Sequence, residues 1–493
     1  MDDTILVIDA GTTSVRAMLF GADGVCLAVE QRDLVQHYPR PGWVEHDAAE
    51  IWEKSLACAR VVADGTGGAE RIAGIGLTNQ RETIVFWSRR SGEPLGPAIV
   101  WQDRRTADLC GRLLEQGHEG AVQARTGLLL DPYFSATKIA WALEHWPRLR
   151  EAGEDLAVGT VESWLVWKLT GGLHVSDATN ASRTALVDIR AGRWDDDLLE
   201  LFRVPSSALP EIVDCAGEFG STDPRLLGAA VPIRGMAGDQ QSAAIGQACL
   251  ASGDTKATYG TGAFVLTHTG ADAPLSRHRL LTTIAWQLGG ERAFALEGSV
   301  FVAGSLVKWL RDELGLIATA AETAEIAAGL TDSGGVYVVP AHCGLGAPHW
   351  RPDARAAISG LSFSTGRTHI VRAALEAMAH QTHDLMRAFA GDGAAWQSLR
   401  IDGGMAANDW LAQDLADMLG LAVERPRFVE TTALGAAMLA AVGARLHHDL
   451  DEAAAAMRGP VDRFAPTIEN ARRTERLEGW RSAVAMVLGE ETG

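Results

Sequence analysis

Three short apolar runs alternate with turns at the start of the chain, at residues 4–8, 15–20 and 25–29. The turns between them, Gly11-Thr12-Thr13 and Asp23-Gly24, carry the glycine and polar residues that favour chain reversal. Short apolar runs bounded by turns predict strands. We therefore expect three antiparallel strands in the first thirty residues.

A helical period and a further strand follow. Residues 48–63 place apolar side chains at helical spacing, and residues 72–77 form an apolar run that is typical of a buried strand. This run ends at the polar cluster 78–82. Because polar residues at the end of a buried strand usually line a ligand site, the cluster is a candidate for function.

The same beginning recurs after Gly253. Strands are predicted at 255–259 and 263–268 on either side of the turn Gly260-Thr261-Gly262, and another apolar run lies at 280–286. Helical and strand patterns then alternate, which predicts an α/β arrangement. The helices are expected at 301–314, 368–390 and 407–419, and the strands at 336–339, 399–401 and 421–424.

This recurrence predicts two domains, residues 1–248 and residues 249–493. A chain of 493 residues is too long for one hydrophobic core and suits two. Helical patterns at 449–457 and 470–488 are expected to cap the second domain.

Composition and charge limit the partners of the protein. The formal net charge of −19 is spread along the chain, which argues against binding a nucleic acid over a broad surface. No run approaches the roughly 18 consecutive apolar residues of a membrane span. The start of the chain lacks the basic region of a signal peptide, so we expect a cytoplasmic protein without a membrane span.

Cysteine and histidine spacing indicates neither a disulfide framework nor a metal centre. The six cysteines contain no CxxC pair, so we interpret them as buried small hydrophobic residues. The histidines, among them the pair His447-His448, lack acidic or cysteine partners at ligand spacing. The cysteines are Cys26, Cys58, Cys110, Cys215, Cys249 and Cys343.

Two glycine turns are candidates for binding phosphate. Asp9 ends the first predicted strand, and in the turn that follows, successive backbone N–H groups and hydroxyls can point at one anion. Arg16 adds a cation two residues after Ser14, although an ordinary hairpin turn explains the pattern as well. The second turn, Gly260–Gly262, offers the same chemistry from the other half of the chain. Neither turn has the P-loop or Rossmann spacing.

Asp239 is a candidate for proton chemistry. It follows an apolar stretch, at the point where the Gly238-Asp239-Gln240-Gln241 segment opens a helix of small residues. Phosphoryl transfer to an alcohol needs a carboxylate near the hydroxyl and a metal on the phosphates, and Asp9 and Asp239 could meet these needs. The alternative is that both are turn or cap residues. The Gly403-Gly404 pair, before a helix that Asn408 starts, would let a flat base approach the backbone.

The Arg81-Glu82 pair suits a ligand with neighbouring hydroxyls. Its guanidinium donates hydrogen bonds beside a carboxylate that accepts them. A surface ion pair is the alternative. Trp101, Tyr133 and Phe264 could form an apolar wall for a carbon backbone, although a single aromatic residue more often belongs to the core.

Taken together, these residues resemble the FGGY carbohydrate kinases of the actin, hexokinase and heat-shock ATPase superfamily, over nearly the whole chain. The resemblance implies an α/β fold of two domains, actin-like (ribonuclease H-like), with an interdomain cleft. Its motifs include DAGTTSVRA at 9–17, LTNQRET at 77–83, IVWQDRRT at 99–106, DPYFSATK at 131–138, TNASRT at 179–184, AGDQQSA at 237–243, TYGTGAF at 258–264, LEGSVFVAG at 296–304, DGGMAAND at 402–409 and ETTALGAA at 430–437.

The resemblance also implies an activity, the ATP-dependent phosphorylation of a small polyol with Mg²⁺. Glycerol, giving sn-glycerol 3-phosphate, is the substrate it favours, and a homo-oligomer (dimer or tetramer) is implied. Asp239 would accept the substrate proton, and Asp9 with Asp239 would hold Mg²⁺. The implied polyol-binding residues are Arg81, Glu82, Trp101, Tyr133, Asp239, Gln240 and Phe264. The implied nucleotide-binding residues are Thr12, Thr13, Ser14, Arg16, Thr261, Gly304, Lys308, Gly404 and Asn408.

The chain departs from the family pattern at several positions. Ala10, Val15 and Lys308 stand where glycerol-specific members usually have Gln, Ser and Gln. The stretch 219–224 replaces a glycine-rich, arginine-bearing stretch that binds a regulatory sugar bisphosphate in some members, which argues against that regulation here. Two alternatives to a glycerol-specific enzyme are a family kinase for another polyol or ketose and a non-catalytic actin-like module.

Overall fold

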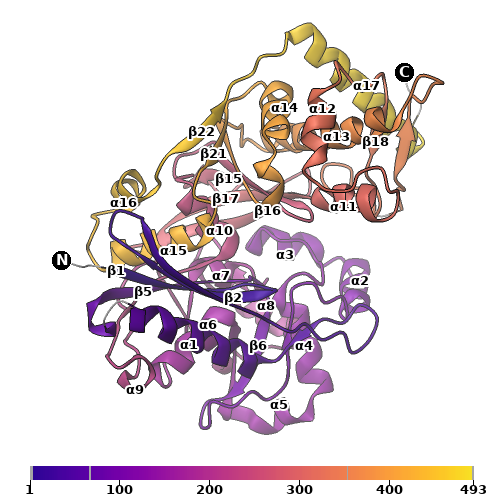
Figure 1. The fold of residues 1–493 in the computed structure, drawn as a ribbon. Coiled ribbons are helices and arrows are strands. Elements are labelled where there is room, and N and C mark those ends of the chain that lie inside the picture. Colours follow the sequence, from indigo (N-terminus) through magenta and orange to yellow (C-terminus); the bar gives the residue numbers. More distant parts are fainter. Residues whose placement is uncertain (1–3, 66–67, 352, 491–493) are drawn as a thin grey trace.

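The computed structural model describes residues 4–65, 68–351 and 353–490. Two large sheets form the centres of two lobes, shown in Figure 1. We call the part built around the first sheet the first lobe and the part around the second sheet the second lobe. The α/β fold with two lobes agrees with the fold class expected from the sequence.

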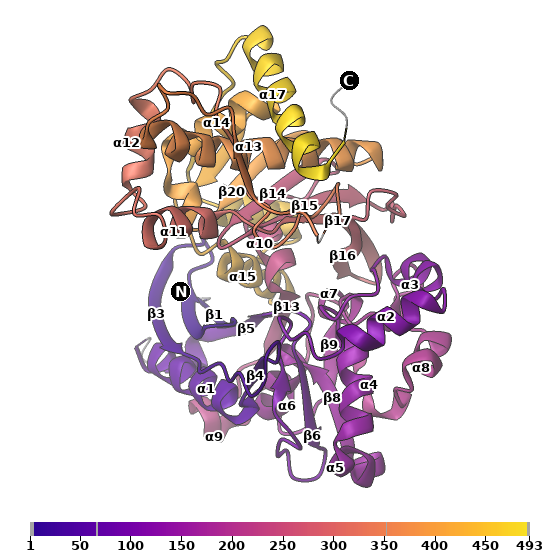
Figure 2. The ribbon, with the colours of Figure 1, turned by 90° about the vertical axis from the view of Figure 1, so that its right-hand side faces the viewer.

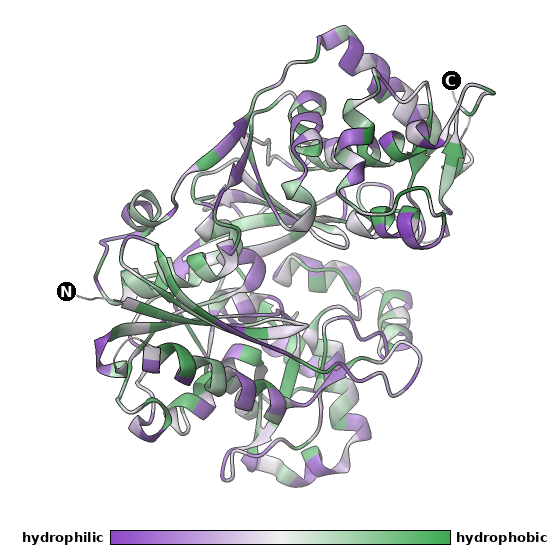
Figure 3. Ribbon diagram, in the orientation of Figure 1, coloured by the Kyte–Doolittle hydropathy of each residue, from purple (hydrophilic) through white to green (hydrophobic). Residues whose placement is uncertain are grey.

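The first sheet has the strand order β13-β5-β1-β2-β3. As predicted, the first three strands are antiparallel neighbours, while β5 and β13 join β1 in parallel. The strands span Thr4–Ala10 (β1), Ser14–Phe20 (β2), Cys26–Asp33 (β3), Ile72–Asn79 (β5) and Ile233–Gly238 (β13). Hydrophobic residues run along β1, as Figure 3 shows, because both faces of this strand are covered.

The second sheet repeats the arrangement. Its order is β16-β17-β15-β14-β20-β21-β22, with β14 antiparallel to β15 and parallel to β20. The recurrence predicted from the two glycine turns is therefore confirmed. The strands span Asp254–Tyr259 (β14), Ala263–Gly270 (β15), Leu281–Leu288 (β16), Glu291–Val300 (β17), Ser398–Asp402 (β20), Val423–Pro426 (β21) and Val461–Phe464 (β22).

The first lobe carries an additional sheet that the sequence patterns did not predict, with the order β4-β7-β6-β8. These strands span Glu45–His46 (β4), Ile84–Ser88 (β6), Ala98–Ile99 (β7) and Leu156–Thr160 (β8). The remaining short strands are β9 (Val175–Asp177), β10 (Val187–Asp188), β11 (Arg193–Trp194), β12 (Glu211–Val213), β18 (Tyr337–Val339) and β19 (Ala357–Ser359).

Helices cover the sheets of both lobes. In the first half of the chain they span Ala48–Gly65 (α1), Ala107–Glu115 (α2), Glu119–Thr126 (α3), Ser135–His145 (α4), Pro147–Ala152 (α5), Val161–Thr170 (α6), Ala178–Ser182 (α7), Asp196–Phe202 (α8), Pro224–Leu227 (α9) and Asp239–Gly246 (α10). In the second half they span Gly304–Asp312 (α11), Glu322–Ala328 (α12), Arg367–Gly391 (α13), Asp409–Leu419 (α14), Thr431–Gly443 (α15), Leu450–Met457 (α16) and Asn470–Leu488 (α17). Among the described residues, no helix is long and apolar enough to cross a membrane.

Helix α15 crosses from the second half of the chain to the first sheet. Together with α10 it lies between the two sheets in Figure 2, and it packs on β1, β5 and β13. A side chain at Gly76 or Gly235 would collide with the α15 backbone, at 2.5 Å from Ala436 O and 2.4 Å from Ala440 N respectively. Glycine in these strands thus permits the close approach of helix and sheet. The domain boundary near residue 248 stays a prediction.

The two C-terminal helices have different positions. Helix α17 packs on the second lobe, where Trp480 Nε1 donates to Asp384 Oδ2 at 2.7 Å. Helix α16 packs instead on α15, and Leu450 and Met457 join the core beneath the first sheet. The expectation that both helices cap the second domain is therefore wrong for α16, because α15 draws the chain back to the first lobe.

All six cysteines are unpaired. Four are buried and Cys26 is half-buried, but Cys343 is exposed, so the expectation of six buried cysteines is wrong for Cys343. It lies in the loop after β18, outside the regular core elements.

Candidate active site

The ends of three neighbouring strands form the floor of the candidate site. Ala10 at the end of β1 is paired with Asn79 at the end of β5, and Asn79 is paired with Gly238 at the end of β13. The three strands are parallel, so the residues that follow them meet at one edge of the sheet. Asp9, Arg81 and Asp239 are brought to this edge.

The first glycine turn joins β1 and β2, and Gly11 N donates to Ser14 O at 3.0 Å. Thr12 Oγ1 accepts a hydrogen bond from Trp101 Nε1 at 3.0 Å, and Thr13 is exposed.

Arg16, on the strand that follows this turn, lies 3.3 Å from Asp9 Oδ2 and also contacts Glu430 in the loop before α15. The first turn is thus linked to a segment from the second half of the chain.

Asp9 is a buried carboxylate. Its pKa is raised to about 6, mainly by burial; Arg16 lowers it, and the negative charges of Asp239 and Glu430 add to the rise. The influence of Asp239 shows that the two aspartates lie close enough to repel each other. A cation between them would relieve this repulsion.

Two of the departures from the family pattern have a structural explanation. Ala10 and Val15 are fully buried in the core on one side of the first sheet, and they are paired with each other across β1 and β2. Their side chains serve packing. Lys308, the third departure, is exposed on α11 one turn after Gly304.

The second glycine turn, between β14 and β15, supports the start of α11. Gly304 N donates to Gly260 O at 2.9 Å, and Ser305 N donates to Thr261 O at 3.0 Å. A side chain at Gly304 would lie 2.6 Å from Gly260 O and 3.4 Å from Met405 Cγ. The segment after β20 is thus adjacent to this turn, as expected for residues that share one ligand.

The loop after β20 contains two glycines with different roles. Gly403 has a φ of 86°. A Cβ there would lie 2.5 Å from Tyr259 O, so the close backbone approach requires glycine at 403. At Gly404 an added Cβ would meet no atom within 4 Å. Asn408 caps α14 by accepting from Leu411 N at 3.1 Å, which confirms it as the start of this helix.

Asp239 is the first residue of α10. Its Oδ1 accepts from Gln240 N at 2.7 Å and lies 3.3 Å from Arg81 Nε. The side chain is 34% exposed, whereas that of Arg81 is 2% exposed. Burial of the carboxyl group raises the pKa of Asp239, and the cations of Arg81 and Lys256 oppose this rise. The site thus presents an accessible carboxylate beside a rigidly held guanidinium.

Arg81 and Glu82 belong to a buried group of four charges, which we call the ion quartet and which also includes Arg183 and Glu297. Arg81 donates to both carboxylate oxygens of Glu297, at 2.6 and 3.2 Å. Arg183 donates to Glu82 at 2.6 Å and to Glu297 at 3.0 Å. The four side chains are at most 3% exposed, so the alternative of a surface ion pair at Arg81-Glu82 is wrong.

The ion quartet joins the two lobes. Glu297 comes from β17 of the second sheet, whereas the other three residues come from the first lobe. Burial alone would raise the pKa of Glu297, but Arg183 and Arg81 hold it at about 2. Glu82 has a φ of 61°, a conformation that is rare for a residue with a side chain. Such strain is often found at functional sites.

An aromatic wall stands next to Arg81. The Trp101 ring packs edge-on against Tyr133 and Phe264, with ring centroids 5.6 and 6.4 Å apart. Tyr133 OH accepts from Arg81 Nη2 at 3.3 Å, and Phe264 comes from β15 of the second lobe. The structure therefore brings the three predicted aromatic residues together across the two lobes.

Sequence reasoning missed three buried charges of this site, namely Arg183, Lys256 and Glu297. Glu297 lies within the LEGSVFVAG motif and Arg183 within TNASRT, so their positions in motifs were the available signal. Lys256 donates from β14 to Gln240, the residue after Asp239. Among the described residues, no group of three or more His, Cys, Asp or Glu side chains is arranged to hold a metal ion.

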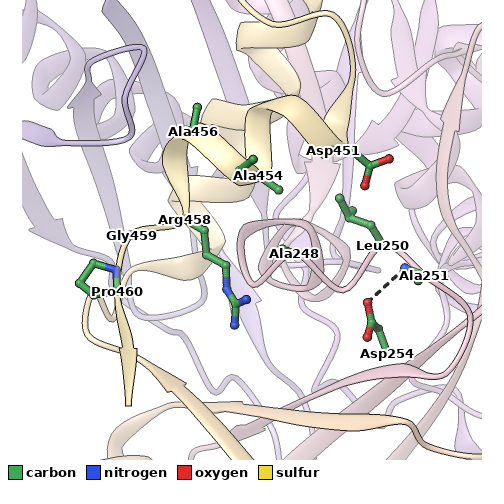
Figure 4. Close-up of a pocket in the computed structure, with 11 residues that line it drawn as sticks. Ala248, Leu250, Ala251, Asp254, Asp451, Ala454, Ala456, Arg458, Gly459 and Pro460 are labelled. Atoms are coloured by element: carbon green, nitrogen blue, oxygen red, sulfur yellow. Dashed lines mark hydrogen bonds between the residues drawn. The ribbon is translucent and has the colours of Figure 1, made fainter. Parts of the chain in front are cut away.

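A large surface pocket lies outside this set of residues. It has a volume of about 620 Å³ and is lined by the segment after α10 and by α16, as Figure 4 shows. Two of its three charged residues have protein partners: Arg458 donates to Glu424 at 2.8 Å, and Asp254 accepts from Ala251 N at 3.2 Å. The chemistry described above thus does not involve this pocket.

Solved structures define the class of protein. The crystal structure of Plasmodium falciparum glycerol kinase with ADP is similar, with a TM-score of 0.94 and 35% identity over 99% of this chain and 98% of that chain. The structure of a xylulose kinase from Rhodospirillum rubrum has a TM-score of 0.87 and 25% identity, and it covers 99% of both chains. The fold is that of a two-domain kinase.

Sequence comparison gives the family. The model of the N-terminal domain of the FGGY family of carbohydrate kinases matches residues 4–246, and that of the C-terminal domain matches residues 255–444. The chain belongs to the FGGY family of carbohydrate kinases. It is 56% identical to a glycerol kinase of Rhodospirillum rubrum and 54% identical to one of Methylobacterium nodulans, in both cases over 99% of each chain.

Proposed function

We propose that this kinase phosphorylates glycerol with ATP and Mg²⁺ and that Asp239 is the general base. The observation that carries the proposal is the 3.3 Å contact between Arg81 Nε and Asp239 Oδ1. It places a hydrogen-bond donor for a hydroxyl next to a carboxylate that can take the proton of that hydroxyl. The full-length relatives named glycerol kinase support glycerol as the acceptor.

The proposed reaction transfers one phosphoryl group. The hydroxyl gives its proton to Asp239, its oxygen forms a bond to the γ-phosphorus, and the bond from this phosphorus to the β,γ-bridging oxygen breaks. ADP leaves with that electron pair. Arg81, Glu82, Tyr133 and Gln240 would orient the polyol hydroxyls, and Trp101 and Phe264 would cover its carbons.

The phosphates would lie between the two glycine turns. Thr12, Thr13, Ser14 and Arg16 would hold them from the first lobe and Thr261 from the second, while Gly304, Lys308, Gly404 and Asn408 would line the nucleoside. The two mutually repelling carboxylates, Asp9 and Asp239, fit a divalent cation. Bound there, Mg²⁺ would neutralise charge on the triphosphate. A homo-oligomeric state and a cytoplasmic location stay predictions.

The segment that replaces the regulatory stretch is itself negatively charged. Asp223 caps α9 and is bound to Arg225, whose guanidinium holds the pKa of Asp223 at about 2. Arg225 is thus already paired with a carboxylate. This supports the absence of a sugar-bisphosphate site at this position, because the segment offers no free cation to a phosphate.

Glycerol should give the highest kcat/KM in a panel of glycerol, erythritol, dihydroxyacetone and D-xylulose. The proposed aromatic wall packs closely, with ring centroids 5.6 and 6.4 Å apart, so we expect it to cover only a short carbon chain, and one extra carbon unit in such a site costs about 10-fold or more. A coupled assay of ADP release measures each value. A preference of about 10-fold or more for the pentulose or the tetritol would replace glycerol by that substrate, and would favour the alternative of another family kinase.

A further inference from the structure

Lys256 is a fully buried lysine at the centre of the molecule. It lies on β14 and its side chain has no measurable exposure. Its Nζ donates to Gln240 Oε1 and, at 2.8 Å, to Thr258 Oγ1. Both acceptors are neutral. A buried ammonium group normally requires a negatively charged partner, because removing it from water is costly.

No carboxylate among the described residues forms an ion pair with Lys256. Burial lowers the pKa of Lys256, and the negative charges of Asp402 and Asp239 oppose this change only in part. The ammonium group has three N–H bonds, of which the two protein acceptors use two. The other buried cations of the site differ in this respect, because Arg81 and Arg183 each contact a carboxylate directly.

The position of Lys256 joins the two parts of the proposed reaction. On one side it contacts Gln240, which follows the proposed base Asp239. On the other side it contacts Thr258, two residues before the turn Gly260–Gly262, which is proposed to hold phosphate. Through these two hydrogen bonds, Lys256 connects the residue next to the proposed base with the strand that leads to the proposed phosphate turn.

We propose that Lys256 is a catalytic residue whose free N–H bond binds an oxygen of the transferred phosphoryl group. This inference rests on the proposed function. The lysine neutralises negative charge on the three oxygens of that group as it moves from ADP to the hydroxyl, while its contact with Gln240 keeps the ammonium group in place. The proton balance is unchanged, because Asp239 takes the proton and Lys256 stays protonated.

The test is Lys256→Met, which removes the charge and keeps the length. We expect kcat with glycerol to fall by about 10²- to 10³-fold, as for the loss of one oriented donor to a transition state. Calorimetry with Mg²⁺ should show about 10-fold or more weaker binding of AMP-PCP, an ATP analogue with a γ-phosphoryl group, and an ADP affinity within about threefold of wild type. Lys256→Gln, which keeps a donor, gives the same comparison if the Met variant does not fold.

Arg400→Met is the matched control. Arg400 is paired with Lys256 on the neighbouring strand β20, but it has its own carboxylate partner, Asp254, at 3.2 Å. Its replacement should lower the thermal midpoint and leave the ratio of ADP to AMP-PCP affinity within about threefold of wild type.

Two results would overturn the proposal. One is a folded Lys256 variant with kcat within about threefold of wild type, and the other is an equal loss of affinity for ADP and AMP-PCP, which marks a structural role. If the wild-type protein does not phosphorylate glycerol, the proposed function fails. The comparison of the two nucleotides still tests Lys256 in that case, because it needs no turnover.

Discussion

Asp239→Asn is expected to lower kcat for glycerol by about 10²- to 10⁴-fold, the usual contribution of a positioned base. Asparagine keeps the size of the side chain and can hydrogen-bond a hydroxyl, but it cannot take a proton. ATP affinity measured without Mg²⁺ should be retained, because the two glycine turns at Thr12 and Thr261 are unchanged. Steady-state kinetics, nucleotide titration and the thermal midpoint are measured on the same preparation.

Asp196→Asn is the matched control for this variant. Like Asp239, Asp196 is the first residue of a helix, but it lies on the surface at the start of α8. Its replacement should change kcat by less than about threefold. An Asp239→Asn protein that folds normally, binds ATP and keeps more than about a tenth of wild-type kcat would remove Asp239 from the role of essential base.

Glu297→Gln is expected to have the largest effect on stability. It removes one charge from the ion quartet and leaves Arg81 and Arg183 with a shared neutral partner. Breaking a buried ion pair costs about 3–5 kcal/mol of unfolding free energy. Because Glu297 also fixes the guanidinium of Arg81 beside Asp239, KM for glycerol should rise by about 10-fold or more. Denaturant unfolding and steady-state kinetics measure the two effects.

Glu475→Gln provides the comparison. Glu475 pairs with Arg472 at 2.6 Å on α17, but its side chain is 66% exposed, so the loss should stay below about 1 kcal/mol with KM unchanged. If Glu297→Gln were as mild as this surface variant, the ion quartet would contribute neither stability nor orientation of Arg81.

Local patterns predicted most of the two large sheets. The strands around the glycine turns satisfy two rules at once, because the runs are apolar and the turns between them contain glycine. The sheet of β4, β6, β7 and β8 was missed. Two of its strands, Glu45–His46 and Ala98–Ile99, have only two residues each and carry no period. The crossing of α15 to the first sheet is set by packing between distant segments, which a local pattern does not contain.

Local patterns likewise predicted some residues of the candidate site and missed others. Arg81, Glu82 and Asp239 were found because each follows a buried strand, and the structure brings Arg81 and Asp239 into contact. Glu297 was missed because its role depends on a partner 216 positions away in the chain. Lys256 was missed because it lies within a strand rather than at its end.

Close backbone approach requires glycine at two positions on the proposed nucleotide side. The need for glycine is clear at Gly304, where any side chain would meet Gly260 O. In the loop after β20 the residue that must be glycine is Gly403, whereas the sequence motif had suggested Gly404 as the residue next to the nucleotide. Glycine pairs in a sequence do not tell which member approaches another backbone, because that depends on the three-dimensional arrangement. The assignment of Gly404 and Asn408 to the nucleotide therefore stays a proposal.

The most direct test of glycerol phosphorylation is the identity of the product formed from glycerol, ATP and Mg²⁺. The proposal predicts one phosphomonoester in the ³¹P NMR spectrum, formed in an amount equal to ADP. A dehydrogenase specific for sn-glycerol 3-phosphate should oxidise all of this product. ADP formation that yields inorganic phosphate alone, or a phosphomonoester that this dehydrogenase does not oxidise, would contradict the account.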